Sequence, residues 1–151
     1  MDDTCDKAAA FLGTVFEGAE LSLEVSLKES RDVCILDFRG QDAEILQAAG
    51  GELLEALQHL VNQAFGRDLP RGQRLVCDVH GFRATREAEL RAMAQHAADR
   101  VRATGLAFVF GPMNSNERRI IHMTLADNPD LFTESIGEAA GRRLRVSLKD
   151  T

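Results

Sequence analysis

The sequence contains no tryptophan and no tyrosine, and its 151 residues include only three cysteines and three prolines. Without Trp or Tyr, aromatic stacking surfaces would have to come from the eight phenylalanines, most of which lie in apolar helix or strand patterns. The longest uncharged stretch, which includes residues 105–116, is too short and too polar to span a bilayer. We therefore expect no membrane insertion and few aromatic contacts to a ligand.

The three cysteines, Cys5, Cys34 and Cys77, are odd in number, far apart in the chain and form no C-x-x-C pair. This spacing excludes zinc fingers, zinc ribbons and iron–sulfur sites. It also indicates a reduced, cytoplasmic protein. Cys34 and Cys77 lie in apolar, strand-like runs, which favours buried hydrophobic residues over nucleophiles. The sequence thus predicts neither a metal site nor a cofactor.

Acidic residues dominate the beginning of the chain. Asp2, Asp3 and Asp6 precede the apolar run at residues 8–16, where a signal peptide would carry basic residues, so we expect no export. The net charge is -6, but residues 1–60 hold 13 acidic against 4 basic side chains and residues 61–151 hold 11 against 14. The second part of the chain can therefore carry a basic binding face.

Hydrophobic periodicity predicts an α+β chain that begins with a helix over residues 7–16. Strands over residues 21–28 and 33–38 are close enough to pair as an antiparallel hairpin. Residues 42–65 are typical of two helices separated by a glycine turn, and residues 74–79 of a third strand.

The rest of the chain predicts a smaller unit. A long helix over residues 84–103 is followed by a strand at 107–110 and by a helix that Asn114 caps, with Glu117 in a capping-box position, and that ends near residue 126. Residues 133–141 are predicted to be a loop. Residues 142–149 predict a strand with one apolar face and one basic face, because leucines and a valine alternate with Arg143 and Arg145.

The order of these elements and four segments resemble the Jag family (SpoIIIJ-associated proteins), in which a KH domain precedes an R-3-H domain, named for an Arg and a His with three residues between them. The segments are GGELLEALQHLVNQAF (50–65), RLVCDVHGFRATREAEL (74–90), GPMNSNERRIIHMTL (111–125) and TESIGEAAGRRLRV (133–146). The resemblance implies a type II KH domain over residues 1–81, with a linking helix and a small α/β R-3-H domain over residues 82–151. The family's further N-terminal domain and linker have no counterpart in these residues.

Arg118 and His122 are four residues apart on a predicted helix and therefore share one face, where a cation and an aromatic donor can reach one phosphate or sugar. The resemblance identifies them as the R-3-H pair; an isolated pair would more simply be a helix surface. Four nearby arginines would add positive charge; the simpler explanation for the strand arginines is a solvated strand face that prevents edge pairing. The four are Arg119, Arg142, Arg143 and Arg145.

Two further positions follow from the resemblance. Arg83 and Arg86, where the long helix begins, match the family's basic pair, and helix solubility explains them as well. Phe82, beside them, is the one aromatic residue that we consider for base stacking.

The glycine turn is altered. The family's G-x-x-G turn brings backbone N–H groups to phosphates and carries basic residues. Here residues 48–51 retain Gly50 and Gly51, but the first glycine and the basic residues are missing, and Glu52 and Glu55 follow in the next helical turn. We therefore expect a degenerate KH unit.

Together these features predict a non-catalytic protein that binds single-stranded nucleic acid through salt-sensitive phosphate contacts. We expect RNA as the ligand in preference to DNA. Carboxylate–histidine neighbours (Asp78 with His80, Glu55 with His59) would allow acid–base or metal chemistry, but no catalytic motif accompanies them. The competing interpretation is a protein-interaction module with weakened RNA binding. Its candidate partners, implied by the resemblance, are another small KH protein or components near the membrane-protein insertase.

Overall fold

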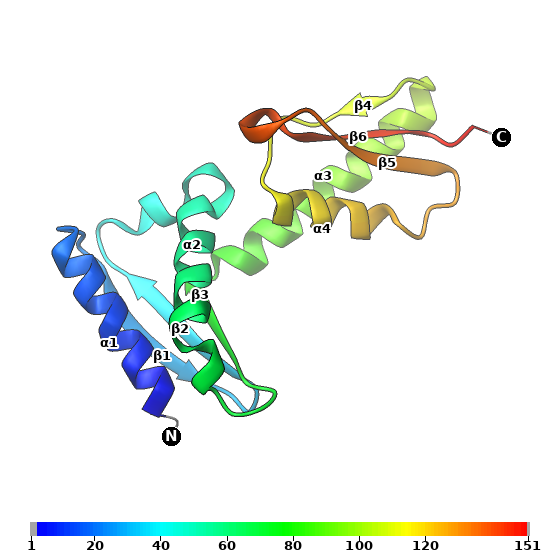
Figure 1. Ribbon diagram of the computed structural model, residues 1–151. Coiled ribbons are helices and arrows are strands. Elements are labelled where there is room, and N and C mark those ends of the chain that lie inside the picture. Colours follow the sequence, from blue (N-terminus) through cyan, green and yellow to red (C-terminus); the bar gives the residue numbers. More distant parts are fainter. Residues whose placement is uncertain (1–2, 151) are drawn as a thin grey trace. The chain divides into compact units, whose positions relative to one another are not determined.

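The computed structural model describes residues 3–150, and its chain divides between Arg83 and Ala84 into two compact units, each with its own sheet and core (Figure 1). We call residues up to 83 the N-terminal unit and those from 84 the C-terminal unit. The predicted boundary after residue 81 coincides with the start of the long helix α3 (Phe82–Thr104) and lies two residues before the division between the units. The α+β class predicted from the sequence is confirmed.

The N-terminal unit contains a three-stranded sheet in the order β1-β2-β3, in which β1 and β2 are antiparallel and β2 and β3 parallel. Its elements are α1 (Asp3–Gly18), β1 (Glu24–Glu29), β2 (Val33–Arg39), α2 (Ala43–Phe65), a 3-10 turn (Gly66–Asp68) and β3 (Arg74–Val79). The predicted hairpin and third strand are thereby confirmed. Strand β1 begins three residues later than predicted, because the Ser22 N–H donates to Asp42 Oδ2 (2.6 Å) instead of joining the ladder.

The core of the N-terminal unit lies between one face of this sheet and the helices α1 and α2. Because side chains alternate along a strand, the paired positions of the three strands place their apolar residues on the same face. Helices α1 and α2 both contribute to this core (Figure 1), and the rings of Phe11 and Phe65 meet edge-on at 5.6 Å. Deeper in the core, Phe16 and Phe38 pack in the same way at 5.1 Å. The sheet contributes Val25, Leu27, Cys34, Leu36, Phe38, Leu75, Cys77 and Val79.

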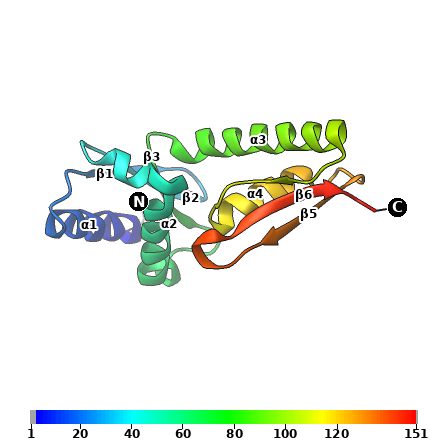
Figure 2. The same cartoon turned by 90° about the horizontal axis from the view of Figure 1, so that it is seen from above.

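The C-terminal unit has an antiparallel sheet in the order β4-β6-β5. Helix α3 runs along it (Figure 2), and β4 (Phe108–Val109), α4 (Ser115–Leu125), β5 (Leu131–Ile136), a 3-10 turn (Ala139–Gly141) and β6 (Arg143–Leu148) follow. The core lies between one sheet face and both helices. It contains Leu90, Ala94, Ala97, Ala98 and Val101 of α3, Ile121 and Leu125 of α4, and Leu131, Leu144 and Val146 of the sheet.

Strand β5 corrects one prediction, because residues 133–136 were expected in a loop. The strand pairs with β6 along its whole length. The segment shows no apolar alternation, because Thr133 and Ser135 are polar and yet lie on the face that turns toward α4. Phe132 lies on the other face and is 46% exposed. Among residues 3–150, no helix combines the length and the hydropathy needed to cross a membrane.

Candidate nucleic-acid interface

Helix α4 begins as the sequence predicted. The Asn114 side chain accepts a hydrogen bond from the Glu117 N–H (Oδ1···N 2.9 Å), which satisfies one of the unpaired donors of the first turn. The reciprocal bond of a capping box is replaced by a longer-range contact, because the buried Glu117 carboxylate accepts from Arg86 Nε on α3 (2.8 Å). This anchor fixes the first turn of α4 to α3.

Arg118 lies one turn before His122 on α4 and is half-buried. Its Nη1 donates to the carbonyl oxygen of Met113 (2.6 Å), which holds the guanidinium near the beginning of the helix. The Met113 N–H in turn donates to the carbonyl oxygen of Arg142 (3.1 Å). Arg118 is therefore held in place through a backbone carbonyl, and it forms no salt bridge with any of residues 3–150.

His122 is exposed, and its Nδ1 hydrogen-bonds to the hydroxyl of Thr133 on β5. Within residues 3–150 no hydrogen bond occupies Nε2. Because the other ring nitrogen is held, the ring can present Nε2 to an external acceptor or donor in a defined direction. The Arg118 and His122 pair is thus oriented by groups outside the helix.

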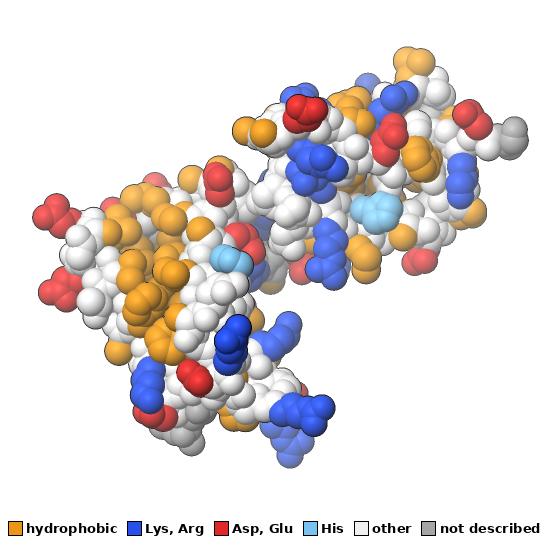
Figure 3. Space-filling view, in the orientation of Figure 1, with side chains coloured by type: hydrophobic (Ala, Val, Ile, Leu, Met, Phe, Trp, Pro, Cys, Tyr) orange, Lys and Arg blue, Asp and Glu red, His pale blue; other side chains and the backbone are white. Residues whose placement is uncertain are grey.

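An open depression of about 350 Å³ lies where this pair faces β5. Its lining combines two arginines and a histidine with hydroxyl groups, the kinds of donor that proteins use for phosphate and sugar contacts, and it also contains one carboxylate, that of Glu134. Figure 3 shows basic side chains around a histidine in the region of α4 and β5. The lining residues are Ser115, Arg118, Arg119, His122, Thr133, Glu134, Ser135 and Leu144.

The strand arginines occupy a different face. In β6, Leu144 and Val146 point into the core, so the alternating Arg143 and Arg145 project from the opposite side of the sheet. Arg145 lies 3.7 Å from its cross-strand neighbour Glu134, and Arg143 Nε donates to the carbonyl oxygen of Gly141. The structure therefore does not bring Arg118 and Arg143 onto one face.

Exposed arginines without an acidic partner are the remaining cations of interest. Arg119 and Arg142 are exposed, and among residues 3–150 neither forms a salt bridge. The Arg119 side chain lines the depression beside His122, whereas Arg142 precedes β6. Together with Arg118, Arg119 gives α4 two uncompensated positive charges on this surface.

Arg86 is engaged within the fold. Besides its bond to Glu117, it donates from Nη1 to Glu89 (3.1 Å). Burial alone would lower the pKa of the Arg86 guanidinium, but the hydrogen bonds to Glu117 and Glu89 raise it above its ordinary value. Because two carboxylates already neutralise the Arg86 guanidinium, Arg86 would attract a phosphate only weakly.

Arg83 is engaged in the same way in the N-terminal unit. Its Nε donates to the carbonyl oxygen of Cys77 (2.6 Å), and its Nη1 forms an ion pair with Glu55 on α2. The backbone N–H of Arg83 and that of Val79 both donate to Asp78 Oδ1. Glu55 and Asp78, considered above as acid–base candidates, are therefore part of the fold's own hydrogen bonding.

The glycine turn interrupts α2 at residues 48–51. Ala49, Gly50 and Gly51 have φ values of 53°, 69° and 83°, a left-handed run that ordinary side chains tolerate poorly. A Cβ on Gly51 would lie 2.6 Å from Cε1 of Phe82, so a side chain here would be strained by the backbone and would have to displace the Phe82 ring. Phe82 packs on the turn and on the core of the N-terminal unit, which restricts its use as a stacking platform.

Sequence reasoning missed the hydroxyl groups of the interface. Ser115 follows the cap of α4, and Thr133 and Ser135 lie on β5, which was not recognised as a strand. The signal that could have revealed the strand is the two-residue spacing of Leu131, Thr133 and Ser135. These residues share one strand face although one is apolar and two are polar.

Comparison with known proteins assigns this architecture to a family. A model of the R-3-H domain matches residues 88–148. The RNA-binding protein KhpB of Clostridium symbiosum is 32% identical over 146 residues, which cover 95% of this chain and 66% of that protein. For the RNA-binding protein KhpB of Bacillus subtilis (strain 168) the values are 31% over 149 residues, with 97% and 72% covered.

A third relative, the RNA-binding protein KhpB of Lactiplantibacillus plantarum, is 32% identical over 114 residues, which cover 76% of this chain and 35% of that protein. The chain thus spans about two thirds of the first two relatives and about one third of the last. The R-3-H match lies within the C-terminal unit, and the other matches extend across both units. The chain belongs to the KhpB, or Jag, family of proteins with an R-3-H domain.

Proposed function

We propose that the protein binds single-stranded RNA through the surface formed by Arg118, Arg119 and His122, which we call the α4 surface. The observation that carries this proposal is the arrangement of two uncompensated arginines and an oriented histidine around a hydroxyl-lined depression. The names of the KhpB relatives and the R-3-H match support RNA as the ligand. In this proposal the protein binds RNA and catalyses no reaction. Single-stranded DNA is the alternative ligand, and the experiment below compares the two.

Secondary contacts come from the other predicted positions. Arg142, Arg143 and Arg145 extend the positive charge along β6, with Arg145 weakened by Glu134. In this proposal the N-terminal unit is a type II KH domain, as its α-β-β-α-β order supports, and Gly50 and Gly51 bring the backbone of the turn near the RNA. Because Arg83 and Arg86 are held by carboxylates, they act on binding indirectly, by fixing α2 and α4.

Electrostatics give the proposal a measurable form. About four phosphate contacts to a single strand should lower the logarithm of affinity with the logarithm of salt concentration at a slope near -3. Without Trp or Tyr, and with Phe82 packed on Gly51, base stacking contributes little, so sequence preference should be weak.

Fluorescence anisotropy of a labelled single-stranded RNA tests the proposal. The double variant Arg118→Ala/His122→Ala should lose most of the binding at low salt and flatten the salt slope. Arg100→Ala, which removes one exposed cation from α3 outside the depression, is the matched control and should bind like the unmodified protein. A DNA strand of the same sequence runs in parallel. Equal losses in both variants would contradict a localised interface.

A protein-interaction role is the second candidate. Two apolar side chains of α2, Ile45 and Leu60, are 46% and 40% exposed, and Figure 3 shows apolar side chains gathered on the N-terminal unit. In this alternative a cytoplasmic partner, such as another KH protein, covers that unit while RNA binding is weak. RNA binding that is absent at low salt, in a protein shown to be folded, would favour it.

A further inference from the structure

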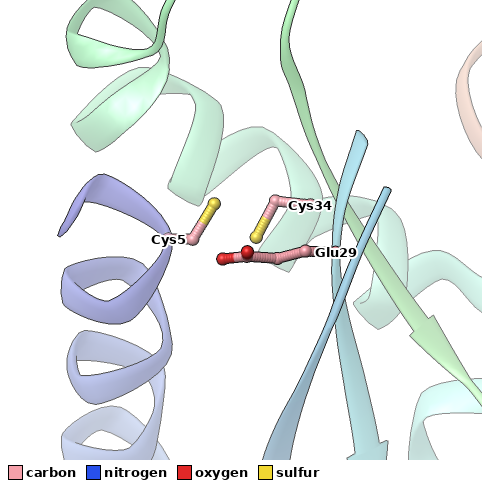
Figure 4. A group of neighbouring side chains, drawn as sticks. All are labelled: Cys5, Glu29 and Cys34. Carbon is pink, nitrogen blue, oxygen red and sulfur yellow. The ribbon is translucent and has the colours of Figure 1, made fainter. Parts of the chain in front are cut away.

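Two cysteines that are distant in the chain lie close together in the N-terminal unit, next to a carboxylate. Cys5 belongs to the first turns of α1, Glu29 ends β1, and Cys34 lies near the start of β2. The two sulfur atoms and a carboxylate oxygen all lie within 4.8 Å of one another. Figure 4 shows the three side chains directed into a common space. Separation in the sequence argued against a shared site, but folding creates one.

The fold holds these three groups in place. Glu29 and Cys34 are direct partners in the β1–β2 ladder, so their side chains leave the sheet on the same face. The hairpin between them is closed by the hydrogen bond from the Ser30 N–H to the carbonyl oxygen of Val33 (2.9 Å). Cys5 and Cys34 are each 1% exposed, whereas Glu29 is exposed. The group therefore has a buried thiol side and an open carboxylate side through which an ion can enter.

The chemistry of this group suits a borderline-soft cation. Zinc binds cysteine sulfur at about 2.3 Å and carboxylate oxygen at about 2.0–2.2 Å, in tetrahedral geometry. Ligand atoms in such a site are about 3.5–3.8 Å apart, so the observed group needs to contract by only about 1 Å. Two thiolates and a carboxylate would balance a divalent charge and leave one unit of negative charge, and hard cations such as Mg²⁺ would be disfavoured by the sulfur ligands.

We propose that Cys5, Glu29 and Cys34 bind one zinc ion, with water as the fourth ligand. Each thiol releases its proton to solvent when its sulfur binds the metal, so affinity falls as the pH is lowered. The ion links the beginning of α1 to the β1–β2 hairpin, and binding therefore stabilises the folded N-terminal unit by mass action.

Cobalt substitution tests this site in the full chain. The reduced, metal-stripped protein is titrated with Co²⁺, whose thiolate charge-transfer and visible bands report tetrahedral sulfur ligation. We expect saturation at one ion per chain and displacement of the cobalt by one equivalent of Zn²⁺. Zn²⁺ should also raise the melting temperature, whereas Mg²⁺ at the same concentration should not.

Three variants locate the ion. Cys34→Ala should abolish the thiolate band pattern of two-sulfur ligation. Glu29→Gln, at an exposed position, should weaken binding by more than about tenfold, because loss of a direct ligand costs at least as much as loss of an outer-shell partner. Cys77→Ala is the control: this third thiol lies apart from the group, and burial raises its pKa to about 12, so it should not contribute. Circular dichroism confirms the fold of each variant.

Several outcomes would overturn the proposal. They are the absence of a thiolate–cobalt band in the unmodified protein, the same band in Glu29→Gln and Cys34→Ala at unchanged affinity, and loss of the band in Cys77→Ala instead. Formation of a Cys5–Cys34 disulfide on mild oxidation, with no metal uptake by the reduced protein, would also overturn it, because the pair would then be a thiol pair and not an ion site.

Discussion

In the N-terminal unit, the arginine next to the glycine turn is held by the fold, whereas in the C-terminal unit the arginines of α4 keep their charge. Arg83 donates to Cys77 and Glu55, while Arg118 is held only by a neutral carbonyl and Arg119 has no acidic partner within residues 3–150. This difference shows that the count of basic residues does not locate a binding surface. What matters is whether carboxylates already neutralise each guanidinium.

The largest expected effect concerns the glycine turn, where Gly51→Ala should cost about 3 kcal/mol of folding free energy, from left-handed backbone strain and from the clash with Phe82. Urea denaturation measures this. Adding Phe82→Leu should recover only the steric part. Because the turn has no basic side chain, the salt slope of the folded fraction should stay the same; a change in slope would make the turn a main part of the interface.

The buried ion pair of the C-terminal unit gives the next effect. Glu117→Ala removes the carboxylate that holds Arg86 and should destabilise the protein by about 2 kcal/mol, because a partly buried cation loses its partner. Glu89→Ala removes the exposed partner of the same arginine and should cost less than about 0.5 kcal/mol. Similar costs in thermal denaturation would show that burial of Glu117 does not matter.

Two arginines of the C-terminal unit sharpen the distinction between paired and unpaired cations. Arg119→Ala should reduce the magnitude of the RNA salt slope by about 0.7, the value of one phosphate contact. Arg145→Ala, whose guanidinium lies near Glu134, should change the slope less. Anisotropy titrations at several salt concentrations measure both. A larger change for Arg145→Ala would move the interface to the outer face of β6.

The smallest effect concerns an alanine in the left-handed region. Ala49 has a φ of 53°, so Ala49→Gly should stabilise the protein by about 0.5 kcal/mol as the strain is relieved. The neighbouring Ala48 has a φ of -63°, and Ala48→Gly should destabilise by about 0.5 kcal/mol because the unfolded chain gains freedom. Chemical denaturation of both variants checks the opposite signs.

Much of the fold could be predicted from the sequence because apolar residues recur at regular spacing. The helices and the first sheet follow from regular spacing of apolar residues, and the cap by Asn114 follows from local chemistry. Strand β5 escaped because its inner face carries Thr133 and Ser135, whose place is set by pairing with β6.

The site was less predictable, because its electrostatics depend on contacts between distant positions. Arg83 meets a carboxylate 28 residues away and Arg86 one 31 residues away, so their engagement could not be seen in a local motif. The approach of Cys5 to Cys34 has the same origin: a helix and a hairpin meet only after the core has formed. That Arg118 and His122 share one helix face was predictable because one helical turn separates them, whereas their choice as a candidate pair came from the family resemblance.

The most direct test of RNA binding at the α4 surface is an amide NMR titration of the full chain with a short single-stranded RNA at low salt. We expect the largest shifts in α4 and the facing strand, at Ser115, Arg119, His122, Thr133 and Ser135, and we expect them to fade as salt is added. Shifts concentrated at residues 48–51, with α4 unchanged, would contradict this expectation and assign RNA binding to the N-terminal unit.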